Sequence, residues 1–256
     1  MNKELIVRSI NSAVDYALLQ EGRLIELQRE KDNNKFGVGD IFISKIKKTI
    51  SGLNASFVDV GYEKDAFLHY HDLGPRVKSL IKFTKLVSDG KITNYSLEKF
   101  KFEKEIEKQG KIDDVINANQ NLLVQIIKEP ISTKGPRISS ELSFAGRFLV
   151  LIPFSNRISV SQKVRSKDER NRLKDLIEEF RPKGFGVIIR TVAQGKKTAE
   201  LSKDLQGLYN QWINLCKKIN GSKVPSRILS ELNRGSSILR DVFDEKFKGV
   251  YCNDKS

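Results

Sequence analysis

The segment Gly186–Thr191 ends in two side chains that can bind a phosphate. The apolar run Val187–Ile189 delivers Arg190 and Thr191 side by side into a loop before a helix. A guanidinium presents a fixed fork of donors to two phosphate oxygens, a threonine hydroxyl can donate to a third, and loop amides near the helix start can add more. A terminal monophosphate suits this segment. From spacing alone, a solvated arginine or a local ion pair is the alternative.

The segment Asn54–Leu68 carries aromatic side chains on short predicted strands. Phe57 points away from the core candidates Val58 and Val60. Small barrels of the OB type use such rings as platforms for unpaired bases. Lysines close in sequence could supply a positive groove; they are Lys45, Lys47, Lys48 and Lys64. The alternative is that Phe57 and Phe67 pack beneath an inserted helix.

The sequence shows no catalytic constellation. His69 and His71 are the only histidines, and no third metal ligand has a suitable spacing. Cys216 and Cys252 lie far apart, which argues against a disulfide framework or a zinc site and fits a reducing cytoplasm. No Ser/His/Asp or Cys/His arrangement is present. We therefore assign no catalytic residue, metal ligand or cofactor to this chain.

The charge balance favours a phosphate-rich partner. The 256 residues include 46 Lys and Arg against 32 Asp and Glu, a net charge of +14. Nucleic acid is the first candidate, and a merely solvated basic surface is the alternative. No helix-turn-helix or zinc-finger pattern supports a DNA-binding protein. Neither an export leader nor an apolar run of roughly 18 to 20 residues is evident, so no membrane partner is expected.

These residues must be positioned by both strands and helices. Three apolar-rich runs open the chain as a predicted β meander, and the polar stretch 31–35 separates them from a barrel-like block that continues to about residue 128. Within that block, the charged stretch Tyr95–Glu105 is predicted to be helical and to end at Gly110.

The later part of the chain alternates strands and helices. A strand is predicted at Arg147–Ile152, a helix after the capping box of Ser166 and Glu169, and a long helix at Lys197–Ile219. One further helix and a short strand at Val250–Tyr251 are predicted for the last stretch of the chain, Val224–Ser256. The long helix has one apolar stripe, formed by Leu201, Leu205, Leu208, Trp212, Leu215 and Ile219.

Taken together, these motifs resemble the N-terminal half of the bacterial ribonuclease E/ribonuclease G family. The segments similar to its OB-fold RNA-binding domain are Asp40–Ile46, Ala55–Gly61, Ala66–Leu68, Leu123–Lys128 and Lys134–Gly135. The segments similar to its 5′-sensor are Ser143–Pro153 and Gly184–Thr191. The stretches Phe154–Arg157 and Gln162–Lys163 depart from the family's usual loop, so the shape of the phosphate pocket is left open.

The resemblance implies two binding sites. Gly146, Val150, Arg190 and Thr191 would form the pocket for an RNA 5′-monophosphate. In the barrel, Phe57 and Phe67 would stack on unpaired bases, and Lys134 would contact the RNA backbone.

It also implies an α+β, multidomain fold in four parts. A ribonuclease H-like subdomain would be interrupted by the other domains, and its second piece would be truncated. The expected parts are residues 1–35 as its first piece, residues 36–138 as the OB-fold β-barrel with a charged insertion near 85–118, residues 139–220 as the α/β 5′-sensor domain, and residues 221–256 as its second piece.

The implied activity belongs to a longer parent protein. That protein would be a cytoplasmic, homo-oligomeric endoribonuclease that cleaves single-stranded RNA in RNA processing and decay. Its magnesium-binding aspartates would lie in a DNase I-like domain absent from this chain, which alone would be inactive. The alternative is a non-enzymatic OB-fold RNA-binding or translation-associated protein.

Overall fold

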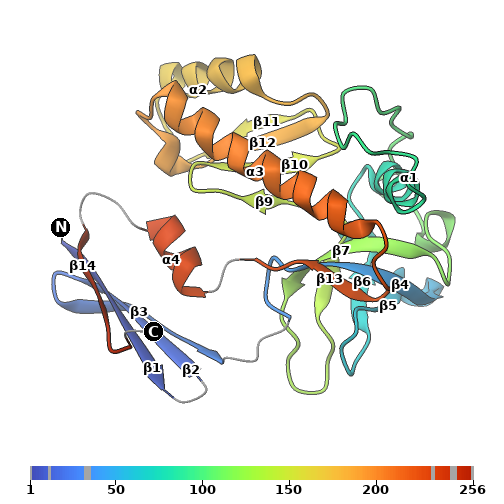
Figure 1. Ribbon diagram of the computed structural model, residues 1–256, viewed down its shortest axis with the longest axis horizontal. Helices are drawn as coiled ribbons and strands as arrows, with labels where there is room; N and C mark the ends of the chain where they lie inside the picture. Colours follow the sequence, from blue (N-terminus) through green and yellow to red (C-terminus); the bar gives the residue numbers. More distant parts are fainter. Residues whose placement is uncertain (1, 11–12, 32–35, 232–233, 243–246, 255–256) are drawn as a thin grey trace. The chain divides into compact units, whose positions relative to one another are not determined.

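Two compact units make up the structure, a computed structural model shown in Figure 1. Residues 1–35 and 232–256 form the first unit, and residues 36–231 form the second. The residues described are 2–10, 13–31, 36–231, 234–242 and 247–254. Most of the polar break predicted at 31–35 therefore lies outside the described residues.

The first unit is a four-stranded sheet in the order β14-β1-β2-β3. β2 is antiparallel to β1 and β3, whereas β14 runs parallel to β1. Leu5, Tyr16 and Ile238 form its small buried core. The predicted opening strands and the C-terminal helix and strand are confirmed. The elements are β1 (Lys3–Ile10), β2 (Ala13–Gln20), β3 (Arg23–Lys31), α4 (Arg234–Val242) and β14 (Phe247–Cys252).

Five strands of the second unit close into a barrel. They follow the order β4-β5-β6-β8-β7, and β7 pairs back with β4. Ile41, Ile43, Val58 and Leu68 are fully buried, and the core position predicted for Val58 is confirmed. β13 joins the barrel by pairing with β4. The elements are β4 (Ile41–Ile50), β5 (Ala55–Asp59), β6 (Ala66–His69), α1 (Val77–Ser88), β7 (Asn121–Lys128), β8 (Arg137–Ser139) and β13 (Ser226–Leu229).

The charged stretch between β6 and β7 is irregular, and the helix predicted there is wrong. Residues 95–105 contain no helix. Instead, the indole N–H of Trp212 donates a 2.8 Å hydrogen bond to the carbonyl oxygen of Tyr95. The ring of Phe100 packs edge-on against that of Phe154, with 6.0 Å between centroids. These contacts with the core outweigh the helix propensity of the lysines and glutamates, because tertiary packing commonly overrides local propensity.

A second sheet, in the order β11-β12-β10-β9, has α2 and α3 packed on one face. Ser166 caps α2 by accepting the backbone N–H of Glu169, which confirms the predicted start of this helix. The elements are β9 (Phe144–Ala145), β10 (Leu149–Pro153), β11 (Ile158–Val160), α2 (Lys167–Phe180), β12 (Phe185–Ile189) and α3 (Thr198–Ile219).

α3 joins this sheet to the barrel through one continuous core. It contacts β9 and β10 of the sheet and also β13 and α1. Trp212 is fully buried among aromatic rings that include Phe83 of α1 and Phe185 of β12. The predicted apolar stripe of this helix is confirmed, since all six of its residues are buried.

The fold is therefore mixed α+β with a closed five-stranded barrel, as predicted at that level. The four-part division of the chain stays a prediction. Ser226–Leu229, in the expected last part, pairs with β4 in the second unit. No helix among the described residues is long and apolar enough to cross a membrane.

Candidate nucleic-acid interface

Phe57 and Phe67 form an aromatic pair on the outside of the barrel. They lie directly opposite each other on β5 and β6, with ring centroids 6.1 Å apart in an edge-to-face arrangement. Both rings are half-buried. The ammonium group of Lys48 lies 5.6 Å from the centroid of Phe57, within the range of a cation–π interaction. A strand pair thus presents two rings and a positive charge on one surface.

These rings line an open groove of about 670 Å³ that Lys134 also lines. Three sequence-predicted residues from distant segments therefore meet at one site. No residue of the inserted stretch Tyr95–Glu105 lines the groove, and that stretch contains no helix, so the rings do not pack beneath an inserted helix. The other lining residues are Lys48, Lys64, Asp65, Lys128, Glu129, Ile131, Thr133, Gly135 and Arg137.

The charge of the groove is mainly positive. Lys64, Lys128 and Lys134 make no ion pair with any residue that the structure describes. The carboxylate of Asp65 is paired with Lys47 at 2.6 Å, and this hydrogen bond raises the pKa of Lys47. Of the four lysines proposed from the sequence, Lys48 and Lys64 line the groove, whereas Lys45 and Lys47 do not.

Gly135 fixes the position of the Lys134 segment against the barrel. A Cβ atom at residue 135 would lie 2.1 Å from the carbonyl oxygen of Asp65, so only glycine permits this approach. Ile131 and Lys134 exchange backbone hydrogen bonds of 3.2 and 3.0 Å, which close a tight turn. Lys134 thus lies in a hydrogen-bonded turn that packs against the barrel.

A second candidate site lies where β12 ends. The guanidinium of Arg190 donates a 2.7 Å hydrogen bond to the carbonyl oxygen of Gly146 in the loop between β9 and β10. The backbone N–H of Arg190 donates to the carbonyl oxygen of Phe148 at 2.8 Å. The structure therefore brings together two predicted pocket residues that are 44 positions apart.

Asp204 of α3 organises the loop that carries Gly146. Its carboxylate accepts the backbone N–H groups of Arg147, Phe148 and Leu149 at 2.9 to 3.1 Å. A Cβ atom at residue 146 would lie 2.6 Å from one oxygen of this carboxylate, which explains the glycine. The sequence analysis missed Asp204. Its signal was an acidic residue three positions after Leu201, on the apolar side of the helix.

Two hydroxyl groups meet beside Arg190. The side-chain oxygens of Thr191 and Ser161 are 2.8 Å apart, and Ser161 follows the last residue of β11. The guanidinium of Arg170 donates to the carbonyl oxygen of Ser161 at 2.8 Å and so anchors that segment. Ser161 was also missed, because only the parallel pairing of β11 with β12 brings it to Thr191.

Val150 lies on the sheet face opposite the buried one. It pairs with Ala145 on β9 and with Ile188 on β12. Val150 is half-buried and Ile188 is 39% exposed, whereas their neighbours Leu149 and Ile189 are fully buried. Val150 thus places an apolar surface next to the strand segment that leads to Gly146.

Cations surround the nearby ring of Phe148. The guanidinium of Arg147 and the ammonium group of Lys196 lie 5.4 and 5.6 Å from its centroid. Lys196 also pairs with Glu200 at 3.3 Å. The loop that contributes Gly146 therefore has two cations beside it, together with the carboxylate of Asp204.

An ion pair holds the loop between Thr191 and α3. Arg172 pairs with Glu169 at 2.7 Å, and the backbone N–H of Gly195 donates to the same carboxylate at 2.8 Å. The hydrogen bond from Arg172, followed by that from Gly195, lowers the pKa of Glu169 to about 2. Arg172 also donates to the carbonyl oxygen of Lys196. Glu169 is therefore charged at neutral pH and ties α2 to this loop.

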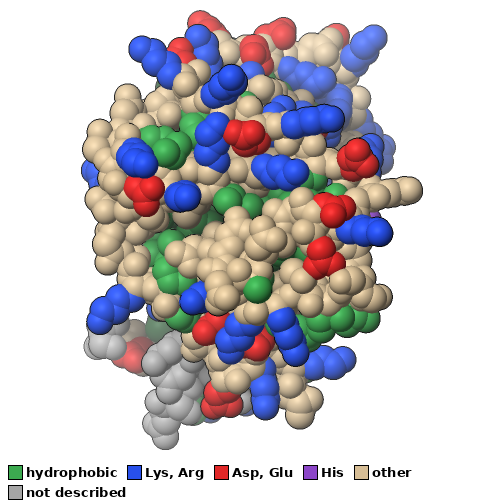
Figure 2. Space-filling view, turned by 90° about the vertical axis from the view of Figure 1, so that its right-hand side faces the viewer, with side chains coloured by type: hydrophobic (Ala, Val, Ile, Leu, Met, Phe, Trp, Pro, Cys, Tyr) green, Lys and Arg blue, Asp and Glu red, His purple; other side chains and the backbone are tan. Residues whose placement is uncertain are grey.

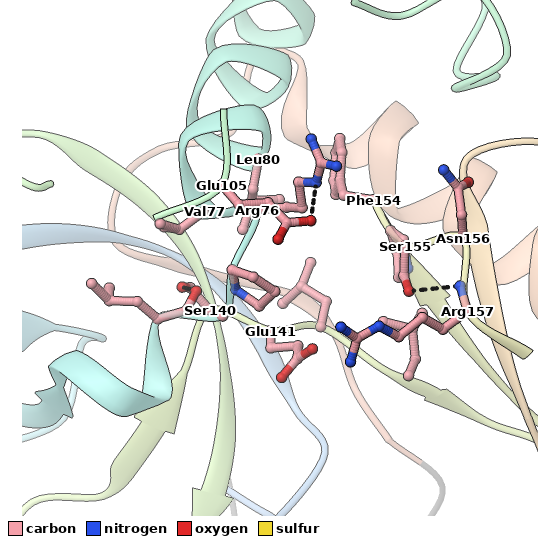
Figure 3. Close-up of a pocket in the computed structure, with 16 residues that line it drawn as sticks. Arg76, Val77, Leu80, Glu105, Ser140, Glu141, Phe154, Ser155, Asn156 and Arg157 are labelled. Carbon is pink, nitrogen blue, oxygen red and sulfur yellow. Dashed lines mark hydrogen bonds and ion pairs between the residues drawn. The ribbon is translucent and has the colours of Figure 1, made fainter. Parts of the chain in front are cut away.

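A separate cavity of about 230 Å³ lies at the start of α1, and Figure 3 shows its lining. Arg76 pairs there with Glu105 at 2.9 Å. The side chains of Arg157 and Glu141 also line it, so both signs of charge are present. Such a balanced lining suits a phosphate less well than the end of β12 does. The loop Phe154–Arg157, which departs from the family's usual sequence, borders this cavity.

Charge alone does not single out either site. Figure 2 shows Lys and Arg side chains spread over one face, with acidic and hydrophobic side chains among them. The groove and the candidate site at Arg190 are distinguished by their particular side chains. The rings of His69 and His71 lie 5.0 Å apart. Among the residues that the structure describes, no three His, Cys, Asp or Glu side chains converge on a possible metal site.

Comparison with known proteins identifies the family. Residues 143–256, which include Gly146 and Arg190, match the model of the ribonuclease E/G family. Ribonuclease G of Escherichia coli K12 is 30% identical over 255 residues, covering 100% of this chain and 48% of that protein. The chain belongs to the ribonuclease E/G family.

Other members of the family are similarly related to it. Ribonuclease E of Nostoc sp. PCC 7120 is 27% identical over 95% of this chain and 31% of its own length. A ribonuclease E/G-like protein of Porphyra purpurea is 31% identical over 85% of this chain and 38% of its own length. The chain thus spans about half the length of the ribonuclease G proteins it matches, and the resemblance noted from its motifs is confirmed.

Proposed function

We propose that this chain is the region of a single-strand-specific endoribonuclease that binds RNA and senses its 5′-monophosphate. The intact enzyme would act in RNA processing and decay. Family membership supports a region of an RNA-processing endoribonuclease. The finer assignment, to base stacking and to 5′-end sensing, rests on the groove and on the pocket at Arg190.

The observation that carries the proposal is the meeting of Phe57, Phe67 and Lys134 in one groove. Rings on a barrel surface stack on bases of any sequence, because every base has an apolar π-face. Paired bases in a duplex already stack on one another, so these rings favour single strands. The lysines along the groove would contact the phosphates, with a strong dependence on salt.

The pocket at Arg190 supports the sensing role. The hydrogen bond to Gly146 fixes the position of the Arg190 guanidinium at the end of β12. The hydroxyls of Thr191 and Ser161 add donors beside it. Val150 would form the apolar wall of this pocket. A terminal monophosphate has more free oxygens and more charge than an internal phosphodiester, so it would gain most from these donors.

The remaining parts of the proposal concern the scaffold. The parallel pairing of β1 with β14 supports two pieces of one interrupted, ribonuclease H-like subdomain around the RNA-binding parts. Cleavage would use Mg²⁺ bound by aspartates of a further domain of the parent enzyme. We assign no catalytic step to this chain. The parent enzyme would be a cytoplasmic homo-oligomer.

The test is RNA binding by the full chain at fixed salt, measured by fluorescence anisotropy. The 5′-hydroxyl form of one RNA is compared as a single strand and as a duplex. We expect a preference for the single strand. The double substitution Phe57→Ala with Phe67→Ala should weaken that binding by roughly ten- to a hundredfold. Tyr251→Ala, an exposed ring on β14, serves as the control and should change little.

Equal affinity of the double variant and the unsubstituted chain would refute the stacking role. A preference for the duplex would refute single-strand recognition. Normal groove binding without any response to the 5′ end would instead favour a general OB-fold RNA-binding protein.

A further inference from the structure

The cavity at the start of α1 shares no lining residue with the groove or with the candidate site at Arg190. Its volume is about 230 Å³, below the roughly 300 Å³ of the smallest pockets that hold drug-sized ligands, so it suits one small molecule. Part of its lining is apolar and buried, which gives such a ligand a dry contact surface. The buried apolar side chains are Leu73, Val77, Leu80, Leu142 and Phe154.

One pair of charges in the lining is already satisfied. Arg76 pairs with Glu105 at 2.9 Å, and its guanidinium also donates a 2.9 Å hydrogen bond to the carbonyl oxygen of Glu103. The guanidinium therefore has donors committed to two protein groups, and it offsets the carboxylate of Glu105. Neither charge requires a ligand to balance it.

The other two charges in the lining belong to Glu141 and Arg157. Neither side chain makes a hydrogen bond or an ion pair with any residue that the structure describes. Figure 3 shows the two side chains on the same side of the cavity, extending toward each other from separate segments. The cavity thus offers one uncommitted carboxylate to a cation and one uncommitted guanidinium to an anion.

The backbone on both sides holds these two residues in position. The Cβ atom of Glu141 packs against Gly74, where an added Cβ atom would lie 2.9 Å from it. The backbone N–H of Arg157 donates to the hydroxyl of Ser155 at 3.3 Å, and its carbonyl oxygen accepts the N–H of Val187 at 2.9 Å. The two charges are therefore presented by ordered segments, which lowers the entropic cost of binding.

From these observations we infer that the cavity is a binding site for a free amino acid with an apolar side chain. Arg157 binds its carboxylate and Glu141 binds its ammonium group, both through charge-assisted hydrogen bonds. The apolar side chain packs against Leu80, Leu142 and Phe154. A ligand with a single charge would leave one of the two protein charges without a partner. A peptide carries its terminal ammonium and carboxylate on different residues, whereas a free amino acid carries both on one carbon atom.

The test uses leucine as the probe, with two analogues that each lack one charged group. Isocaproate lacks the ammonium group, and isoamylamine lacks the carboxylate. Occupancy is followed by heteronuclear NMR titration of the full chain, through the backbone amide signals of Ser155 and Asn156. We expect leucine to bind with a Kd of roughly 1 mM, and each analogue to bind at least roughly tenfold more weakly.

Substitutions should exchange the specificity of the site. Glu141→Gln removes the negative charge, so this variant should bind isocaproate at least as tightly as leucine. Arg157→Gln should likewise bind isoamylamine at least as tightly as leucine. A structural defect would weaken all three ligands together, so this reversal identifies direct contacts. Lys174→Ala, an exposed lysine on α2, is the control and should keep the preference for leucine.

Three results would overturn the inference. The first is the absence of a saturable shift of these amide signals with leucine at up to about 20 mM. The second is equal affinity of the unsubstituted chain for leucine and for both analogues, because the two charges would then recognise nothing. The third is an unchanged preference for leucine in both Glu141→Gln and Arg157→Gln, which would place the ligand elsewhere.

Discussion

The carboxylate of Asp204 accepts the backbone N–H of Phe148 at 2.9 Å, although the two residues are 56 positions apart. It also accepts the N–H groups of Arg147 and Leu149. One helix side chain thus holds the loop that carries Gly146, a residue of the proposed 5′-phosphate site.

Replacing Asp204 should therefore destabilise the second unit. Asp204→Ala leaves three amide donors without this acceptor, and we expect the free energy of unfolding to fall by roughly 3 kcal/mol. Urea unfolding followed by the fluorescence of Trp212, the single tryptophan, measures this change. Asp175→Ala, an exposed acid on α2, is the matched control. Equal stability of the two variants would show that the three hydrogen bonds contribute little.

Gly146→Ala should abolish sensing without affecting the groove. The new Cβ atom would lie 2.6 Å from an oxygen of Asp204, so the loop or the carboxylate must shift and the partner of Arg190 moves with it. We expect unchanged binding of 5′-hydroxyl RNA and no gain from a 5′-monophosphate. Gly207→Ala on the exposed side of α3 meets nothing within 4 Å and should stabilise the helix by roughly 1 kcal/mol. If Gly146→Ala still preferred the 5′-monophosphate RNA, the close packing of Gly146 against Asp204 would not be needed for sensing.

The stability that Glu169 contributes should depend on acid pH. Its folded-state pKa is lowered from 4.5 to about 2, so the contribution is fully present above the unfolded pKa near 4.5 and is lost as pH falls towards 2. At pH 7, Glu169→Gln should lower the free energy of unfolding by roughly 1 to 2 kcal/mol. The difference from the unsubstituted chain should shrink between pH 4.5 and 3.

Urea titrations at several pH values, with Trp212 fluorescence as the signal, test this dependence. The control is Glu178→Gln, which removes the more exposed ion pair with Arg181 on the same helix. An effect of Glu169→Gln that stays constant across this pH range would argue against the charged pair as its source.

Lys134→Ala should weaken RNA binding through the loss of one phosphate contact. We expect the slope of log affinity against log salt to become less steep by about 1, with little dependence on base sequence. Lys174→Ala, an exposed lysine on α2, should leave the slope unchanged. Identical slopes for the two variants would remove Lys134 from the binding surface.

Local sequence patterns predicted the elements well where packing and pattern agree. Ser166 and Glu169 marked the start of α2, and the spacing of leucines around Trp212 defined the buried side of α3. The alternation around Val58 indicated a barrel strand and the outward direction of Phe57. Each of these signals is encoded within about one turn or a few residues of strand, so no knowledge of distant partners was needed.

The failures all depend on long-range contacts. The charged stretch Tyr95–Glu105 has a composition typical of an exposed helix, but its backbone and rings are recruited by Trp212 and Phe154. Asp204 and Ser161 have no distinctive motif of their own. They become parts of the candidate pocket only because α3 and β11 pack beside segments far away in the sequence.

The central claim is that Arg190 reads the 5′ end of RNA. Its most direct test is anisotropy at fixed salt with one short single-stranded RNA, bearing either a 5′-monophosphate or a 5′-hydroxyl. We predict that the full chain binds the monophosphate form roughly tenfold more tightly, and that Arg190→Ala loses this preference while binding the hydroxyl form normally. Equal affinity of the unsubstituted chain for both RNAs, or a preference that persists in Arg190→Ala, would contradict the account.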